Sequence, residues 1–132
     1  MQTDQLLVSV LYVEDEQSAR EILCSVFESK YRFSRLDAAE TGERGLALFK
    51  EHRHDIVITD ISMPIMDGIE MAAAIKAINS ETVIIFLTAH SGTSYLLDSI
   101  EPCVNNYVLK PVNYEKLFAV IDKSISTITL KK

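Results

Sequence analysis

The sequence has few of the residues that secreted and membrane proteins require. Only two of its 132 residues are cysteines, and Cys24 and Cys103 stand far apart in apolar or helical contexts, so we expect free thiols in a reducing cytoplasm. The apolar runs, such as 8–13 with its interrupting Ser9, fall far short of the roughly 20 residues of a membrane span. The first residues lack the basic stretch of a secretion signal. We therefore expect a cytoplasmic protein without membrane contact.

Basic residues are scarce as well. Thirteen Lys and Arg against nineteen Asp and Glu give a net charge of −6 and a pI near 5.0. This balance argues against nucleic-acid binding through a basic surface and suits a metal cation or a basic partner better. The length corresponds to one ordinary domain, and a hydrophobic content of 48% excludes intrinsic disorder.

Short apolar runs alternate with amphipathic stretches along the whole chain, which is the pattern of a parallel sheet wrapped by helices. Continuous β-branched runs predict buried central strands at 7–13, 56–59 and 83–87, and more mixed runs predict outer strands at 31–36 and 106–109. Helical spacing predicts helices at 19–27, 41–50, 71–78, 91–101 and 117–128, with Thr41 and Asn113 as caps. The order predicts an α/β protein with an open, doubly wound sheet and helices on both faces.

Polar residues stand at the carboxyl ends of four of these strands. Glu14 and Asp15 follow the first strand, Asp60 the third, Thr88 the fourth and Lys110 the fifth. In open parallel sheets, ligands bind at this edge, where the strand order reverses. Each residue alone is explained equally well as a loop or capping residue, but the joint pattern predicts a binding site.

The residue types at this edge indicate phosphoryl chemistry. Three carboxylates in one crevice repel one another, and a hard divalent cation such as Mg²⁺ would relieve the repulsion. The ammonium group of Lys110 would pair an anion bound beside the metal. With Asp60 as nucleophile, the product of phosphoryl transfer would be an acyl phosphate.

Four segments together resemble the receiver domain of two-component response regulators of the chemotaxis-regulator type. They are YVEDE at 12–16, DISMPIMDG at 60–68, LTAH at 87–90 and YVLKP at 107–111, and the resemblance covers residues 5–128. It implies a flavodoxin-like (βα)5 fold with strand order 2-1-3-4-5. It also implies a signalling switch, not an enzyme acting on a separate substrate, that takes its phosphoryl group from a sensor histidine kinase or a phosphotransfer protein.

The resemblance implies a role for each matching residue at the reacting centre. Asp60 would be the phosphoacceptor. Asp15 would bind Mg²⁺, or Mn²⁺, directly, while Glu14 would act through water and Ser62 through its backbone carbonyl. The glutamate departs from the aspartate that many relatives carry at position 14, a change that should preserve metal binding. Thr88 and Lys110 would bind the phosphoryl oxygens.

Further residues would regulate the phosphorylated state. Ser62 and His90 would modulate the lifetime of the phosphoryl group, although His90 fits a plain surface histidine equally well. Thr88 and Tyr107 would form a switch that changes the face built by the fourth helix, fifth strand and fifth helix; alternatively, Tyr107 is an ordinary half-buried strand residue. Pro102 and Cys103 depart from the family pattern before the fifth strand.

Other polar residues are expected to be structural. We expect Asp67 to cap a helix rather than bind a metal, and His52 and His54 to be solvated.

Two other functions compete with the phosphorylated switch. A phosphatase of the haloacid dehalogenase type would need an acid two residues after Asp60, where Ser62 stands, and a degenerate receiver would act only as a docking module.

The sequence does not identify what lies downstream of this domain. We expect no output domain within the chain, which is either a stand-alone receiver or one excised from a longer protein. Its partners would be a downstream protein or a second, phosphorylated copy.

Overall fold

The computed structural model describes residues 6–88 and 106–131. Its strands are β1 (Ser9–Val13), β2 (Arg35–Ala39), β3 (Ile56–Asp60), β4 (Val83–Thr88) and β5 (Asn106–Leu109). Its helices are α1 (Gln17–Lys30), α2 (Gly42–His52), α3 (Gly68–Ile78) and α5 (Tyr114–Lys131). The expected helix at 91–101 lies outside the described residues.

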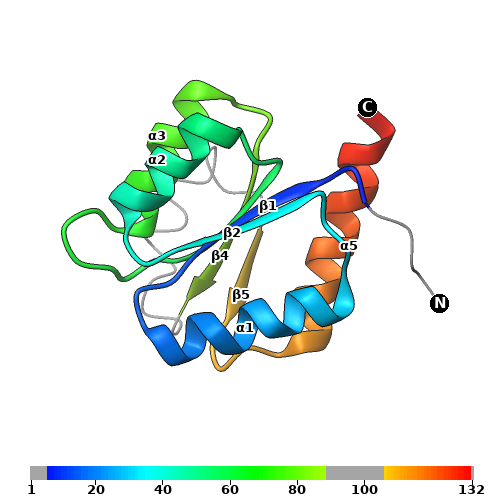
Figure 1. Cartoon of the computed structure of the whole chain (residues 1–132), viewed down its shortest axis with the longest axis horizontal. Helices are drawn as coiled ribbons and strands as arrows, with labels where there is room; N and C mark the ends of the chain where they lie inside the picture. The colour runs from blue at the N-terminus through cyan, green and yellow to red at the C-terminus, as the bar shows by residue number, and fades with distance from the viewer. Residues whose placement is uncertain (1–5, 89–105, 132) are drawn as a thin grey trace.

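All five strands pair in parallel, in the order β2-β1-β3-β4-β5. Figure 1 shows α2 and α3 on one face of the sheet and α1 and α5 on the other. The predicted doubly wound fold and its strand order are therefore confirmed. Within the described part of the chain, no helix is both long and apolar enough to cross a bilayer.

The sheet separates two hydrophobic cores. Because side chains alternate along a strand, Leu11 and Val13 of β1 pack with the α2–α3 layer, whereas Val10 and Tyr12 pack with the α1–α5 layer. The central strands are buried on both faces, and every residue of β4 is buried. This double burial explains why their sequences are continuously apolar instead of alternating.

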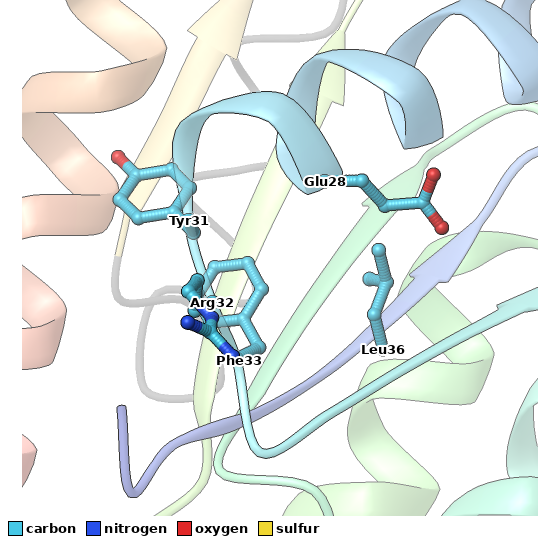
Figure 2. Close-up of a pocket in the computed structure, with 5 residues that line it drawn as sticks. All are labelled: Glu28, Tyr31, Arg32, Phe33 and Leu36. Atoms are coloured by element: carbon cyan, nitrogen blue, oxygen red, sulfur yellow. The ribbon is translucent and has the colours of Figure 1, made fainter. Parts of the chain in front are cut away.

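The prediction for the second strand was wrong in position, since β2 begins at Arg35 and not at residue 31. The rings of Tyr31 and Phe33 stack with centroids 4.8 Å apart, and the Tyr31 hydroxyl donates a hydrogen bond of 2.8 Å to Asp122 of α5. They border a hollow of about 290 Å³ beside the end of α1 (Figure 2), lined by Glu28, Tyr31, Arg32, Phe33 and Leu36. These aromatic residues join α1 to α5, although their composition is typical of a strand.

The predicted helix caps are confirmed. The Thr41 hydroxyl accepts a hydrogen bond of 3.0 Å from the backbone N–H of Arg44, and the Asn113 side chain accepts one of 3.1 Å from the backbone N–H of Lys116. Asp67 caps α3 in a capping box with the side chain of the third helical residue. Asp67 is thus a structural residue, as expected.

The expectation that His54 is solvated was wrong. Arg53 ends α2 in a left-handed conformation with φ of 52°, and His54 then enters the interior with only 1% of its surface exposed. Its Nε2 lies 2.7 Å from Oδ2 of Asp37 in β2, an oxygen that also accepts a hydrogen bond of 2.6 Å from Arg35. His52 remains partly exposed, 3.7 Å from the carboxylate of Glu51. His54 therefore links the start of β3 to an edge strand.

We expect acid to weaken the fold through His54. Burial lowers the pKa of His54 more than Asp37 raises it. The stability that neutral His54 provides is therefore complete above its unfolded pKa of about 6.5, and is lost as pH falls from there toward the lower folded pKa, by at most about 1.4 kcal/mol per pH unit. Urea unfolding between about pH 5 and 8 measures this slope. His54→Gln should flatten it; an equal slope in parent and variant would contradict the prediction.

Candidate functional site

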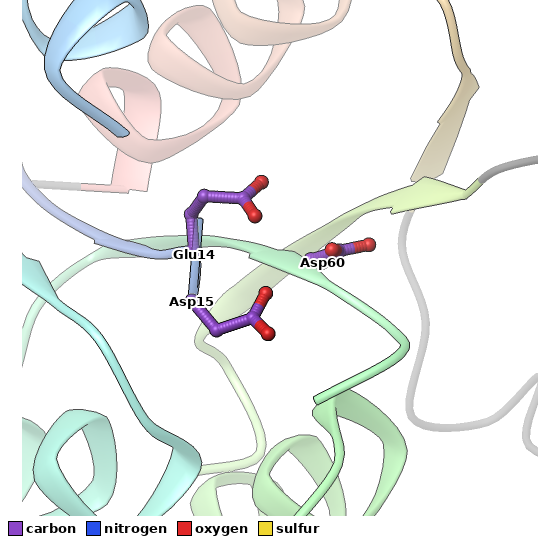
Figure 3. Close-up of side chains that lie close together, drawn as sticks. All are labelled: Glu14, Asp15 and Asp60. Carbon is purple, nitrogen blue, oxygen red and sulfur yellow. The ribbon is translucent and has the colours of Figure 1, made fainter. Parts of the chain in front are cut away.

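Three carboxylates meet at the carboxyl edge of the sheet. Strands β1 and β3 are neighbours, with Val13 opposite Thr59, so Glu14, Asp15 and Asp60 leave the sheet at the same edge. Figure 3 shows the three side chains directed toward a common space, and one oxygen from each lies within 4.8 Å of the other two. The structure thus brings together the three acids that the sequence placed at strand ends.

Lys110 supplies the positive charge at this edge. Its backbone N–H donates a hydrogen bond of 2.7 Å to the carbonyl of Thr88, and its peptide bond to Pro111 is cis. Its Nζ lies 3.2 Å from Oδ2 of Asp60 and 3.5 Å from Oε1 of Glu14. Burial alone would lower the pKa of Lys110, but the two carboxylates raise it above its ordinary value. One ammonium group faces three carboxylates, so the cluster keeps an excess of negative charge.

Glu14 is the most buried of the three acids, with 2% of its surface exposed. Burial raises the pKa of Glu14, and the nearby charge of Asp60 raises it further. The backbone N–H of Glu16 and the ammonium group of Lys110 counteract this rise. Arg20 fixes the turn by donating a hydrogen bond of 2.8 Å to the carbonyl of Glu14. Asp15, in contrast, is exposed and accessible to an ion.

The loop after Asp60 is held tightly against the strand end. The N–H of Gly68 donates a hydrogen bond of 2.9 Å to the carbonyl of Ile61. A Cβ atom at position 68 would collide with the backbone carbonyl oxygen of Asp60, so only glycine fits there. At the outer tip, Ile65 has φ of 69° in a tight turn closed by a 2.8 Å hydrogen bond from Met66 to Pro64. The start of α3 and this loop fix the peptide that carries Asp60.

Comparison with known proteins identifies this arrangement. The family model of the response regulator receiver domain matches residues 10–122, a range that contains every residue of the cluster. The chain belongs to this family. The receiver domain is 30% identical over 117 residues to the chemotaxis protein CheY of Bacillus subtilis, covering 89% of this chain and 97% of CheY.

Two further matches define the extent of the similarity. The receiver domain is 30% identical over 127 residues to the sensory transduction protein LytT of Oceanobacillus iheyensis, covering 95% of this chain but 51% of LytT. A receiver domain protein from Clostridium thermocellum superposes with a TM-score of 0.85 at 26% identity, covering 96% of this chain and 100% of that one. The chain therefore spans almost all of CheY and about half of LytT.

The acidic cluster of the receiver domain suits a hard divalent cation. Carboxylate oxygens are the ligands that Mg²⁺ and Mn²⁺ prefer, and the negative excess left by Lys110 favours a cation over a neutral ligand. Within the described part of the chain, Glu14, Asp15 and Asp60 form an acidic group able to hold such a cation. Their roles as ligands stay a prediction. Ser62, the other predicted ligand, is exposed in the loop that follows Asp60.

The predicted switch residues lie on the paired strands β4 and β5, with Tyr107 opposite Phe86 and Thr88 opposite Leu109. Thr88 is buried at the end of β4, one position beyond the Asp60–Leu87 pair. Tyr107 lies on the edge strand β5 with 53% of its surface exposed. His90 lies outside the described residues.

Sequence reasoning missed the places of Tyr12 and Arg20, which lie beside the receiver site without belonging to its reactive groups. Tyr12 could have been found, because it stands on the first strand two residues before Glu14, and alternation favours one side for both. Its ring borders a hollow of about 260 Å³ beside Glu14 and Lys110. Arg20 acts through the backbone carbonyl of Glu14, and no sequence motif indicates such a contact.

Proposed function

We propose that Asp60 accepts a phosphoryl group from a phosphohistidine of a sensor histidine kinase or phosphotransfer protein, in a Mg²⁺-dependent reaction of a receiver unit spanning residues 5–128. The observation that carries this proposal is the position of Asp60, whose carboxylate lies 3.2 Å from Lys110 and beside the acidic pair. Among the three acids, Asp60 is the one closest to the ammonium group. It can therefore receive an anion without leaving it uncompensated.

The transfer exchanges one bond for another. An Oδ atom of Asp60 attacks the phosphorus, the new O–P bond forms, the P–N bond breaks, and the electron pair returns to the imidazole of the donor. Lys110 neutralises negative charge on the phosphoryl oxygens, which is the main protein contribution in such reactions. Mg²⁺, held by Glu14, Asp15 and Asp60, would screen the repulsion between the phosphoryl group and the carboxylates.

Apolar groups around the site support a protein as the donor. Ile22 of α1 is 58% exposed and Tyr114 of α5 is 42% exposed, and both border the hollow beside Lys110. Pro111 lines the same hollow. Exposed apolar groups that gather around a reactive centre are typical of a contact surface for another protein.

The phosphorylated state would be communicated through Thr88 and Tyr107. The Thr88 hydroxyl would bind a phosphoryl oxygen, and the exposed Tyr107 ring would turn inward into the space that Thr88 leaves. Between β5 and α5 a hollow of about 530 Å³ is lined by Tyr107, Leu109 and Val120 among others. A change of the Tyr107 ring would reshape this surface for a downstream protein or a second copy, while Ser62 and His90 would modulate the phosphoryl lifetime.

Phosphorylation from a small donor tests the proposal without knowledge of the kinase. Acetyl phosphate in the presence of Mg²⁺ should add one phosphoryl group to the chain, because metal and Lys110 together offset the charge of the donor. Excess EDTA should prevent the addition, and renewed Mg²⁺ should restore it. Intact-mass spectrometry measures both results. Equal labelling with Mg²⁺ and with EDTA would refute the role of the metal.

A further inference from the structure

Two histidines meet at the edge of the sheet opposite the acidic cluster. His52 is the last residue of α2 and His54 precedes β3, whereas Asp60 ends that strand. The two imidazole rings lie edge to face, with centroids 5.9 Å apart and an interplanar angle of 74°. They form a pair of nitrogen-bearing side chains that takes no part in the proposed phosphoryl transfer.

One nitrogen of His54 lacks a partner within the part of the chain that the structure describes. The side chain is completely buried, and its Nδ1 atom makes no hydrogen bond to a described residue. The other nitrogen, Nε2, lies 2.7 Å from Oδ2 of Asp37. An ionised carboxylate only accepts hydrogen bonds, so Nε2 carries the proton and the lone pair of neutral His54 is on Nδ1. Buried polar atoms are nearly always satisfied, so this lone pair points to a ligand.

The distance between the two rings suits two ligands of one metal ion. With Zn–N bonds of about 2.0–2.1 Å and near-tetrahedral angles, the centres of two bound imidazoles lie about 5–6 Å apart. The observed separation of 5.9 Å falls in this range. His54 is fixed in the interior, but 23% of the His52 side chain is exposed, so its ring is able to turn toward a shared ion.

A carboxylate stands beside each imidazole. Nε2 of His54 faces Asp37, and Nε2 of His52 lies 3.7 Å from a carboxylate oxygen of Glu51. Histidines that bind metals typically donate their second ring N–H to a carboxylate, which fixes the tautomer and the ring orientation. Arg35 donates to the same oxygen of Asp37 at 2.6 Å and holds that carboxylate in place. This arrangement leaves Nδ1 of each ring as the metal-binding atom.

We propose that His52 and His54 form a second metal site, which binds a transition-metal ion of the Zn²⁺ class through Nδ1 of each imidazole. Imidazole nitrogens suit Zn²⁺, Ni²⁺ and Cu²⁺, whereas Mg²⁺ prefers oxygen ligands. Water would complete the coordination shell on the exposed side of His52. The two ends of β3 would therefore bind ions of different chemistry.

A bound ion would clamp the end of α2 to the start of β3. Because His54 also contacts Asp37 of β2, the clamp would extend to the edge of the sheet. The two rings are brought together only in the folded chain, so an ion bound by both stabilises the fold by mass action. The midpoint of thermal unfolding should therefore rise with Zn²⁺ concentration in the parent and stay constant in His52→Gln.

Nuclear magnetic resonance of the whole chain tests the site at the two rings themselves. Addition of Zn²⁺ should shift the ring ¹⁵N signals of His52 and His54, and Nδ1 of each should shift most because it would bind the ion. Mg²⁺ should leave both rings unchanged. If Zn²⁺ shifts neither ring, the proposal is wrong and a buried water molecule satisfies Nδ1 of His54.

Two single variants separate this site from the acidic cluster. His52→Gln removes one ligand at a partly exposed position, so the fold should persist, as circular dichroism would show. Its Kd for Zn²⁺ should rise at least tenfold, since loss of an outer partner of a metal ligand alone costs about ten- to a hundredfold. Its Kd for Mg²⁺ should equal that of the parent. Asp15→Asn is the reciprocal control, which should weaken Mg²⁺ binding and leave the Zn²⁺ response of both rings intact.

The outcome does not depend on the proposed phosphoryl transfer. A parent that is never labelled on Asp60 but shows the Zn²⁺ shifts of both rings would still support the second site. Equal Kd values for Zn²⁺ in the parent and in His52→Gln would overturn it. Loss of the ring shifts in Asp15→Asn would also overturn it, because the ion would then reside at the acidic cluster.

Discussion

We expect substitution of Asp60 by asparagine to abolish labelling by acetyl phosphate and to preserve the fold. The amide has the shape of the carboxylate but lacks its charge, so it is no nucleophile for phosphorus. The parent should gain one phosphoryl group by intact-mass spectrometry in Mg²⁺, and Asp60→Asn should gain none. Loss of one partner of Lys110 should not unfold the chain, because Glu14 still lies 3.5 Å from the ammonium group.

The control for this experiment is the same chemical change at a nearby aspartate. Asp67 caps α3 in the loop that follows Asp60, and it makes its contacts to the backbone of that helix. Asp67→Asn should therefore be labelled like the parent, since asparagine also caps helices. Labelling of Asp60→Asn at the rate of the parent would place the phosphoacceptor elsewhere.

Substitution of Thr88 by alanine should separate phosphorylation from its effect on the surface. In the proposed switch the hydroxyl would offer the phosphoryl group a charge-assisted hydrogen bond of about 1.5–3 kcal/mol, enough to shift a two-state equilibrium roughly ten- to a hundredfold. Thr88→Ala should be labelled on Asp60, yet the ring at position 107 should stay outside. The chain has no tryptophan, so Tyr107→Trp supplies a single fluorescent reporter of that ring.

The reporter gives a clear reading of both outcomes. Tyr107 is 53% exposed, so a tryptophan there should emit as a solvated indole and shift to shorter wavelength when phosphorylation turns it inward. Thr88→Ala should eliminate the shift, whereas Thr88→Ser, which retains the hydroxyl, should restore it. An equal shift in the alanine and parent backgrounds would mean that the signal does not pass through Thr88.

The central strands and the acidic site could be predicted from sequence because each rests on a strong, simple signal. Strands β1, β3 and β4 are buried on both faces and therefore have continuous apolar sequences. The acids at the ends of β1 and β3 had to meet because parallel strands end at one edge of a sheet. The position of β2 was less predictable, since Tyr31 and Phe33 pack between helices and have the composition of a strand.

Contacts between distant residues account for what the sequence did not reveal. His54 was taken as solvated because no carboxylate or cysteine stands at metal-ligand spacing from it, whereas its partner Asp37 is 17 residues away. The hydrogen bond from Arg20 to the backbone of Glu14 uses a carbonyl group that every residue possesses. Such interactions depend on the three-dimensional path of the chain and leave no local pattern.

Gly68 shows that the absence of a side chain can constrain a site as strictly as a reactive group does. It has no side chain to offer, yet any side chain there would collide with the carbonyl of Asp60, the proposed phosphoacceptor. The exposed residues Ile22 and Tyr114, which border the proposed donor surface, tolerate substitution, whereas position 68 accepts only glycine. The contact between the start of α3 and the end of β3 therefore restricts substitution as strictly as the acidic residues themselves do.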